Sequence, residues 1–196
     1  MIPEIVTTID ELRDIQRLTF NEYSRLGYVG PEAGPELSLC PELDLNEDGT
    51  LYPHTTIYFL RGGHDLLLGT VSITMDGPEG LHTDHVFPCE TESFRQQVAT
   101  KSQVLAGVWR IVIKHGCHTC VMGMLMEIVR SEMYKRSIDI ALCTFNPHHR
   151  KFYERVGFIA LTESIEDHMN APSLLMIGRP KDLERLDVLK HRFFCD

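Results

Sequence analysis

The sequence lacks any apolar run that approaches the roughly 18 residues of a membrane-spanning helix. Its first residues, MIPEIVTTIDELRD, are acidic and lack the basic and apolar blocks of an export signal. We therefore expect a cytoplasmic protein without a membrane span. The 196 residues, of which 43% are hydrophobic, fit one domain over residues 1–196 with a full-sized core.

A second Cys-x2-Cys pair is also lacking. The pair that is present, Cys117 and Cys120, lies beside His115 and His118 in KHGCHTC, but a tetrahedral zinc site needs more ligands than this segment is expected to supply. Without an export signal we expect all six cysteines to be reduced thiols: Cys40, Cys89, Cys117, Cys120, Cys143 and Cys195. The sequence therefore predicts structural thiols and no bound metal.

Basic residues are scarce in the first half of the chain. Residues 1–109 carry 6 basic and 17 acidic side chains, whereas residues 110–155 carry 8 basic and 4 acidic ones. A broad basic field is missing, so we do not expect a nucleic-acid partner. The local basic segment indicates an anionic ligand, or alternatively a solvated helix face that carries Arg130, Lys135 and Arg136.

Apolar spacing and turn residues divide the chain into alternating helices and strands. Strands are expected around residues 54–60, 66–76, 102–115, 138–145, 157–166 and 171–180, and helices around 10–26, 89–97, 116–137 and 181–194. Residues 30–52, rich in proline, glycine and acidic residues, predict a long loop. This order predicts an α/β (α+β) fold with a mixed sheet and helices on its faces.

The segment NPHHRKFYERVGF, residues 146–158, follows the apolar strand pattern IDIALCTF. It predicts a strand end, a short polar helix and a return into the sheet. Ligands bind beyond the carboxyl ends of strands in open α/β sheets, so we expect a site here.

This segment resembles the C-terminal half of GNAT-type acyltransferases, on the matching positions Asn146, Tyr153, Gly157 and Phe158. In that family an asparagine at the strand end and a tyrosine on the next helix flank a thioester. The resemblance implies a three-layer fold with a mostly antiparallel mixed sheet and helices on both faces.

Further segments are similar, in order, to the long-chain N-acyl amino acid synthases, which are relatives of the acyl-homoserine lactone (autoinducer) synthases. They are LRDIQRLTFNEYSRLGYV, LGTVSITMDGPEGLHTDHVF, FYERVGF and MNAPSLLMIG, and the similarity spans roughly residues 8–180. It implies acyl transfer from a thioester, typically on acyl carrier protein, to the amine of an amino acid.

Two positions depart from the pattern of these relatives. Acetyl-CoA users carry a glycine-rich turn before the long helix, whereas this chain has KHGCHTCVMG there. Backbone N–H groups at a helix start still bind phosphate, so a single phosphopantetheine phosphate is expected at His115, Gly116, Cys117 and His118. The synthases also tend to carry a glutamate where this chain has Gly107.

Acyl transfer needs a neutral amine, donors for the oxyanion and a proton for the leaving thiolate. Tyr153 is the expected proton donor, although a buried structural tyrosine is an equal alternative. His149 is the expected base, and adjacent helical residues diverge, so at most one of His148 and His149 should face the site. The alternative is that both are solvent-exposed helix residues without a catalytic role. Asn146 is expected at the pantetheine or as a helix cap. Arg150 and Lys151 are expected to contact a phosphate or an acidic carrier protein. The alternative is that they are exposed charges that only keep the protein soluble.

Arg110 interrupts the apolar run VWRIVI, and a buried charge is costly unless it is paired. We expect its partner to be Asp76, Asp84 or a substrate carboxylate, with Trp109 on the opposite face of the sheet. Asp76, Asp84 and His85 flank a loop on the expected acceptor side and are candidates for binding an amino group.

The sequence therefore predicts an N-acyltransferase that uses acyl-CoA or an acyl-phosphopantetheine as co-substrate, with no permanent cofactor. The expected partners are acyl carrier protein and a small-molecule amine. One alternative is a conventional acetyl-CoA-dependent N-acetyltransferase, and another is a non-catalytic module that binds an acyl group or a partner. The acceptor, the chain length and the oligomeric state are left open by the sequence.

Overall fold

A computed structural model describes residues 2–117, 119–167 and 171–187. It contains an eight-stranded sheet in the order β1-β2-β3-β4-β5-β8-β6, with β7 also paired to β8. Among the described pairings, only that between β4 and β5 is parallel. The strands are β1 Pro3–Ile5, β2 Thr55–Arg61, β3 Leu67–Met75, β4 Leu105–Ile113, β5 Ile140–Phe145, β6 Ile159–Ala160, β7 Ile165–Glu166 and β8 Pro172–Gly178.

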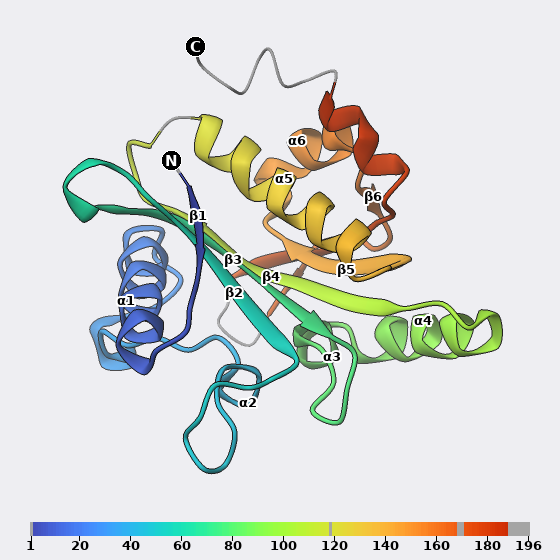
Figure 1. Ribbon diagram of the computed structural model, residues 1–196, viewed down its shortest axis with the longest axis horizontal. Coiled ribbons are helices and arrows are strands. Elements are labelled where there is room, and N and C mark those ends of the chain that lie inside the picture. Colours follow the sequence, from blue (N-terminus) through green and yellow to red (C-terminus); the bar gives the residue numbers. More distant parts are fainter. Residues whose placement is uncertain (1, 118, 168–170, 188–196) are drawn as a thin grey trace.

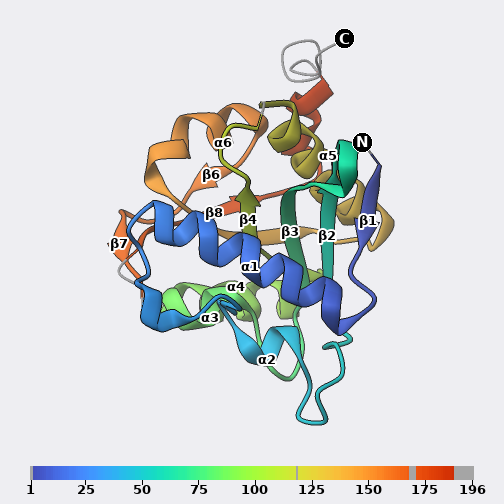
Figure 2. The ribbon, with the colours of Figure 1, turned by 90° about the vertical axis from the view of Figure 1, so that its left-hand side faces the viewer.

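Helices cover both faces of this sheet, as Figures 1 and 2 show. One face carries α1 Ile9–Arg25, α2 Pro41–Asp44, α3 His82–Val86 and α4 Pro88–Lys101, and the other carries α5 Thr119–Lys135 and α6 Arg150–Val156. The predicted three-layer α/β fold with a mostly antiparallel sheet is confirmed. In the described part of the chain, no helix is both long and apolar enough to cross a membrane.

Helix α1 begins where its sequence supplies a capping box. The Thr8 hydroxyl accepts a hydrogen bond from the Glu11 backbone N–H at 3.2 Å, and the Glu11 carboxylate accepts one from the Thr8 N–H at 3.0 Å. These two bonds satisfy donors that a helix start would otherwise leave unpaired. Leu12, Ile15 and Leu18 recur at helical spacing and are buried, so α1 is held against β2 and β4 by its apolar face.

The largest core cluster lies between the sheet and α5. Val71, Ile73 and Val108 project from the strands onto the fully buried Leu125 and Val129 of α5. The methionines of this helix, which the sequence predicts to be core rather than cofactor-binding, include the buried Met126 and Met133 in the same cluster. The helix therefore supports the strand pair that carries the site.

Strand β4 contains a β-bulge at Arg110. Two residues, Arg110 and Ile111, stand opposite one residue of β3, and Arg110 adopts a left-handed backbone with φ +50°. A bulge of this kind bends its strand and re-aims side chains. Strand β4 also loses its other neighbour near this bend: it pairs with β5 over residues 105–108, and the pairing ends there.

Two halves of β4 are distinguished below: the closed half, residues 105–108, and the open half, residues 109–113. The closed half pairs with β5 over Ile140–Cys143, whereas in the described structure the open half has no partner on that strand. Beyond Cys143, β5 continues alongside β8, with Phe145 opposite Leu174. The two parallel strands therefore diverge and leave an opening at their carboxyl ends.

The motif that follows β5 forms a short 3-10 turn, Pro147–His149, and then α6. Gly157 ends α6 with φ +115°, and a side chain at this position would collide with the Asp182 backbone. Glycine is therefore required for the chain to turn back, and Phe158 enters the core with 2% of its surface exposed. The predicted strand end, helix and return are confirmed.

Several segments differ from their sequence predictions. The region expected as one strand at 157–166 forms the short strands β6 and β7, and the loop expected at 30–52 contains α2. Helix α3 lies in a stretch for which the sequence predicts no helix. Strand β1 was not predicted because three exposed residues carry no periodic signal. The terminal helix expected at 181–194 begins with a 3-10 turn, Asp182–Glu184, and its end lies outside the described residues.

Candidate active site

A cavity of about 520 Å³ occupies the opening between the open half of β4 and the end of β5. Its wall includes Met122 of α5, on one face of the sheet, and His82 of α3, on the other. Further lining residues come from the end of α1 and the turn after it, the turn after β5, α6, the end of β7 and the start of β8: Glu22, Tyr23, Tyr28, Asn146, His148, His149, Tyr153, Asp167 and Ser173. The cavity therefore extends between the two strands from one face of the sheet to the other.

Tyr153 projects from α6 into the wall of this cavity. Its ring stacks on that of Phe145 with the centroids 3.6 Å apart and only 3% of the residue is exposed. No hydrogen bond joins its hydroxyl to another residue that the structure describes. Burial, with smaller contributions from Cys143 and Tyr23, raises the pKa of the Tyr153 phenol. The group therefore keeps its proton at neutral pH and is suited to be a proton donor.

The turn after β5 is organised by Asn146. Its Oδ1 accepts a hydrogen bond from the His148 backbone N–H at 2.9 Å, and its Nδ2 donates to the Tyr28 hydroxyl. His148 and His149 both line the cavity, so the prediction that at most one would face it is wrong. They belong to a 3-10 turn at the cavity mouth rather than to a regular α-helix.

His149 lies at the exposed mouth of the cavity. Partial loss of hydration, together with neighbouring His148, lowers the pKa of its imidazole from the ordinary 6.5. The ring is therefore neutral at pH 7 and can accept a proton. This state is the one that a base for the incoming amine needs.

Arg110 is completely buried and its partner is Asp44 of α2. Its Nη2 donates to both carboxylate oxygens at 2.6 Å, and Ser38 also donates to Asp44 at 2.6 Å. The expected partners Asp76 and Asp84 are therefore wrong. Two nitrogens, Nε and Nη1, find no hydrogen-bond partner among the described residues, and Arg110 lines the cavity.

The sequence predicts that Trp109 and Arg110 point to opposite faces of the sheet, and this prediction is wrong. The Arg110 guanidinium lies over the Trp109 ring, 4.3 Å from its centroid, because the bulge interrupts the alternation of the strand. Trp109 is 1% exposed, donates from its indole nitrogen to the Thr74 hydroxyl at 2.9 Å and packs against residues of the 30–52 segment. It therefore supports the cavity wall from behind.

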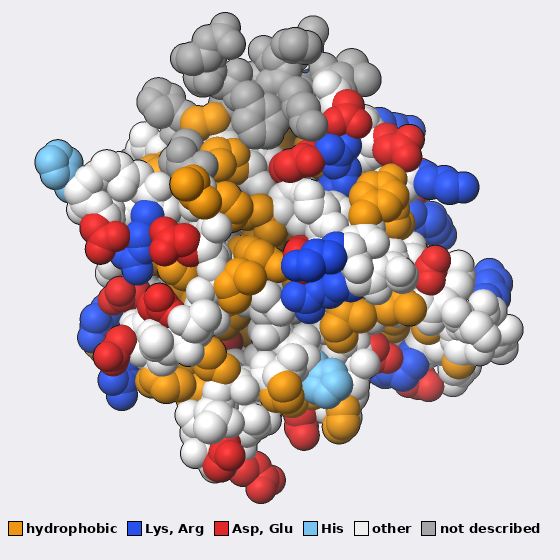
Figure 3. Space-filling model, in the orientation of Figure 1, with side chains coloured by type: hydrophobic (Ala, Val, Ile, Leu, Met, Phe, Trp, Pro, Cys, Tyr) orange, Lys and Arg blue, Asp and Glu red, His pale blue; other side chains and the backbone are white. Residues whose placement is uncertain are grey.

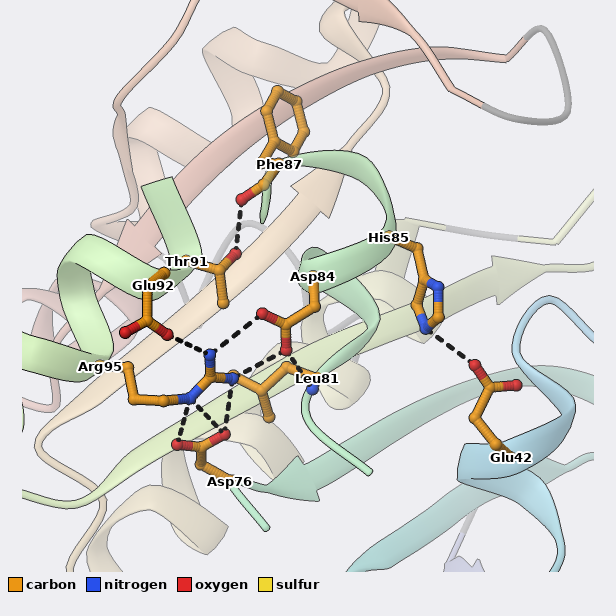
Figure 4. A network of polar contacts seen from close by, with 9 residues as sticks. All are labelled: Glu42, Asp76, Leu81, Asp84, His85, Phe87, Thr91, Glu92 and Arg95. Atoms are coloured by element: carbon orange, nitrogen blue, oxygen red, sulfur yellow. Dashed lines mark hydrogen bonds and ion pairs between the residues drawn. The ribbon is translucent and has the colours of Figure 1, made fainter. Parts of the chain in front are cut away.

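Asp76 and Asp84 bind Arg95 of α4 instead of facing the cavity (Figure 4). Arg95 reaches Asp76 at 3.0 Å and Asp84 at 2.8 Å, and these carboxylates raise the pKa of its guanidinium. Asp84 also accepts the Leu81 backbone N–H at 2.7 Å, which holds the first turn of α3. The structure thus gives both residues a structural environment, and neither meets the predicted acceptor position.

The turn between β4 and α5 also lies away from the cavity lining. The His115 backbone N–H donates to the Glu22 carboxylate at 2.8 Å, and the Cys117 N–H donates to the Lys114 carbonyl at 3.1 Å. Gly116 supplies a left-handed residue with φ +80°, and His118 lies outside the described residues. Two of the N–H groups expected to hold phosphate therefore already have partners.

The position of the missing glutamate, Gly107, belongs to the closed half of β4. A side-chain carbon added there would lie 3.4 Å from Leu81, which is fully buried. Leu81 thus takes up space that a longer side chain at residue 107 would need, and a proton acceptor has to come from another part of the cavity.

His82 is a cavity residue that the sequence does not reveal. It stacks on Trp109 with the centroids 5.3 Å apart and the planes at 6°, and its Nδ1 lies 3.2 Å from the Thr144 hydroxyl. It stands on a five-residue helix within a glycine-rich stretch, so no periodic pattern marks it. Tyr23 and Tyr28 carry a weak signal, because both end the apolar pattern of α1.

The basic segment is neutralised locally. Arg130 pairs with Glu127 at 2.6 Å and with Asp187 at 2.8 Å, and Arg136 pairs with Glu132 at 2.6 Å. Figure 3 shows acidic and basic side chains interspersed at the upper right of the face drawn. Arg150 pairs with Glu154 at 2.7 Å and does not line the cavity. These contacts favour the solvated helix face over a concentrated anion site.

A mostly antiparallel sheet that opens at its one parallel pair, with a tyrosine in the opening, has the architecture of the GNAT-type acyltransferases. The sequence model described as N-acyl amino acid synthase FeeM matches residues 14–178. The chain therefore belongs to the N-acyl amino acid synthase family and is an acyl-transferring enzyme.

Solved structures share this fold. FeeM, an N-acyl amino acid synthase from uncultured soil microbes, is 23% identical with a TM-score of 0.76 over 100% of this chain and 98% of its own. An acyl-CoA N-acyltransferase from Pseudomonas aeruginosa is 16% identical with a TM-score of 0.58, covering 91% and 99%. The CoA-dependent acyl-homoserine lactone synthase BjaI is 13% identical with a TM-score of 0.56, covering 98% and 89%. A search of curated protein sequences gives no match.

Proposed function

We propose that this enzyme moves a long acyl chain from a thioester to the amine of an amino acid or a similar small molecule. The opening between β4 and β5 carries this proposal, because it places the protonated hydroxyl of Tyr153 beside a cavity that reaches both faces of the sheet. A thioester arm enters from one side and the acceptor from the other. Family membership supports the type of reaction.

In the reaction, the neutral amine nitrogen attacks the thioester carbonyl carbon, and the carbonyl oxygen takes up the negative charge. The carbon–sulfur bond then breaks, and Tyr153 gives its proton to the departing sulfur. His149 accepts the proton that the nitrogen loses and returns it to the tyrosine oxygen through water. The products are an amide and a free thiol.

The open half of β4 is suited to stabilise the oxyanion. The bulge sets residues 110 and 111 outside the regular register with β3, and neither pairs with the described part of β5. A bulge disrupts the ladder locally and re-aims its backbone groups, and backbone N–H groups of fixed direction stabilise developing charge without reorganisation. We place the thioester carbonyl beside them.

Arg110 is proposed to bind the carboxylate of the amino-acid acceptor. Its Nε and Nη1 have no partner among the described residues. Both forks of the guanidinium include Nη2, which Asp44 occupies, so the acceptor carboxylate takes a single charge-assisted hydrogen bond from Nε or Nη1. Asp44 holds the opposite side of the guanidinium in place. The role of Arg110 is therefore to position the substrate rather than to transfer a proton.

This role predicts that an amino acid is a much better acceptor than its decarboxylated amine. Hydrogen bonds to charged groups contribute about 1.5–3 kcal/mol, so we expect kcat/KM to fall roughly 10-fold to 150-fold without the carboxylate. Steady-state assays with matched pairs, such as tyrosine and tyramine, measure this ratio. Equal kcat/KM values for the amino acid and its amine would contradict a contact between Arg110 and the acceptor carboxylate.

For the donor we favour acyl carrier protein over acyl-CoA. The turn at residues 114–117 lacks the glycine-rich pattern, and Glu22 places a negative charge against its His115 N–H. With two of its N–H groups already bonded, the turn has few donors left and suits one phosphopantetheine phosphate better than the several phosphates of CoA. Lys114 and the exposed Lys151 are available to contact an acidic carrier.

The test is to incubate the enzyme with acyl carrier proteins and acyl-CoA thioesters of several chain lengths, together with a pool of amino acids. Mass spectrometry should detect an N-acyl amino acid that forms with a carrier-protein donor. Product from acetyl-CoA alone would support a conventional N-acetyltransferase instead. Tight donor binding without any amide product would support a non-catalytic module.

A further inference from the structure

A group of potential metal ligands lies outside the cavity, where α2 meets α3. The Cys40 sulfur, a Glu42 carboxylate oxygen and a His85 ring nitrogen all lie within 4.8 Å of one another. His85 Nε2 and Glu42 Oε1 are 2.8 Å apart and point toward each other in Figure 4. The sequence does not reveal this group, because His85 is more than 40 residues away from Cys40 and Glu42.

The chain holds these side chains on two short, fixed elements. Cys40 is the N-cap residue of α2, is 2% exposed and packs in a cluster with Leu43 and Trp109. His85 stands on α3, whose first turn is held by Asp84 through the Leu81 N–H and Arg95 (Figure 4). Cys40 is therefore held by its own packing, and the helix that carries His85 is positioned by contacts that involve none of the three ligands.

The donor set suits zinc more than a hard cation. A thiolate, an imidazole and a carboxylate are all ligands of Zn²⁺, whereas Ca²⁺ and Mg²⁺ take oxygen ligands. The thiolate and carboxylate together carry the charge that a dication balances. Three protein ligands leave a fourth tetrahedral position for water.

The distances are close to those that a bound ion would impose. Tetrahedral zinc with these ligands holds their donor atoms about 3.3–3.6 Å apart. Cys40 is fixed in the core, whereas the Glu42 and His85 side chains are 38% and 42% exposed and have room to adjust. That exposure also provides an entry path for the ion.

We propose that Cys40, Glu42 and His85 bind one Zn²⁺ ion, with a water molecule as the fourth ligand, and that the ion clamps α2 to α3. Binding releases the Cys40 thiol proton to solvent and changes no oxidation state. Asp44, two residues after Glu42, holds Arg110, and His82, three residues before His85, lines the cavity. The ion thereby secures two segments of the cavity wall.

The alternative is that this group is an ordinary polar contact. Burial and the neighbouring Glu42 raise the pKa of the Cys40 thiol, which fits a protonated thiol that donates to the carboxylate in the metal-free protein. The alternative predicts no stoichiometric metal and no change of stability with zinc. The two descriptions therefore differ in measurable ways.

The experiment uses the full chain, freed of metal by a chelator and titrated with Co²⁺ as a spectroscopic substitute for Zn²⁺. We expect one equivalent to bind, with a thiolate-to-cobalt charge-transfer band and the intense visible bands of a tetrahedral site. Zinc should displace the cobalt and raise the Tm of the metal-free protein. Absence of the charge-transfer band, or an unchanged Tm with zinc, would overturn the proposal.

Matched variants locate the site. Cys40→Ser and His85→Gln should abolish the charge-transfer band and the shift in Tm, and Glu42→Gln should weaken binding. Cys89→Ser removes an exposed thiol elsewhere and should change neither. If Cys117→Ser/Cys120→Ser abolishes the band while Cys40→Ser leaves it, the metal binds the other cysteine pair and the proposal fails. Circular dichroism of each metal-free variant shows whether it is folded.

Discussion

The two halves of β4 are both mainly apolar in sequence, apart from Arg110, but they differ in their surroundings. The closed half pairs with strands on both sides, so its side chains contribute to the core. The open half pairs with β3 alone and contains a bulge, so its side chains line a cavity. The difference shows that one left-handed residue, Arg110, separates a structural segment from a binding segment within the same strand.

The largest expected effect comes from breaking the ion pair that supports the open half. Asp44→Ala leaves the Arg110 guanidinium buried without its counter-charge, and such changes cost about 3–5 kcal/mol. Urea unfolding measures the loss of free energy of unfolding. Glu154→Ala removes an exposed ion pair and is the control, with an expected cost of about 0.2–1 kcal/mol. Similar losses in both variants would show that the buried ion pair contributes no more to the free energy of unfolding than an exposed one.

The next effect compares a core side chain beside the closed half with a cavity-lining side chain of the open half. Leu142 of β5 faces Gly107 of the closed half and is fully buried, so Leu142→Ala should cost about 2–5 kcal/mol. Ile111 of the open half is only partly buried and lines the cavity, so Ile111→Ala should cost less. Thermal and chemical denaturation of the two variants check the order. A reversed order would mean that the open half is packed as tightly as the closed one.

A smaller effect on free energy is expected from the proposed base at the mouth of the opening. His149→Gln should lower kcat by about 10²-fold, the lower end of the usual range for acid–base catalysis. The pKa of His149 is lowered from 6.5, so the ring is neutral at pH 7 and gains a proton only as the pH falls through this lowered pKa. The activity of the parent enzyme should therefore decline as the pH falls through the pKa of His149. A pH profile of kcat should lose this decline in the variant. An unchanged profile would exclude His149 as the base.

The sequence predicts those parts of the molecule whose signal is local. The apolar spacing of α1 and α5, the glycine turn of the β2–β3 hairpin and the run IDIALCTF each define an element without help from the rest of the chain. The segment NPHHRKFYERVGF likewise indicates that Tyr153 follows a strand end, and the structure places this residue in the cavity wall.

Features that depend on distant contacts were beyond prediction. Arg110 and its partner Asp44 are 66 residues apart, and the bulge that turns Arg110 toward Trp109 has no sequence signature. The partner of Asp76 and Asp84, Arg95, comes from a helix that the sequence predicts too short. Side-chain partners of this kind are set by tertiary packing rather than by periodicity.

The central claim is that the Tyr153 hydroxyl, in the opening between β4 and β5, supplies the proton to the leaving sulfur. The most direct test is a single-turnover measurement with an acyl thioester and a saturating amino acid, comparing the parent enzyme with Tyr153→Phe. We predict that the rate of amide formation falls about 10²–10⁴-fold while the donor dissociation constant is unchanged. A phenylalanine variant that forms the amide at the parent rate would contradict the account.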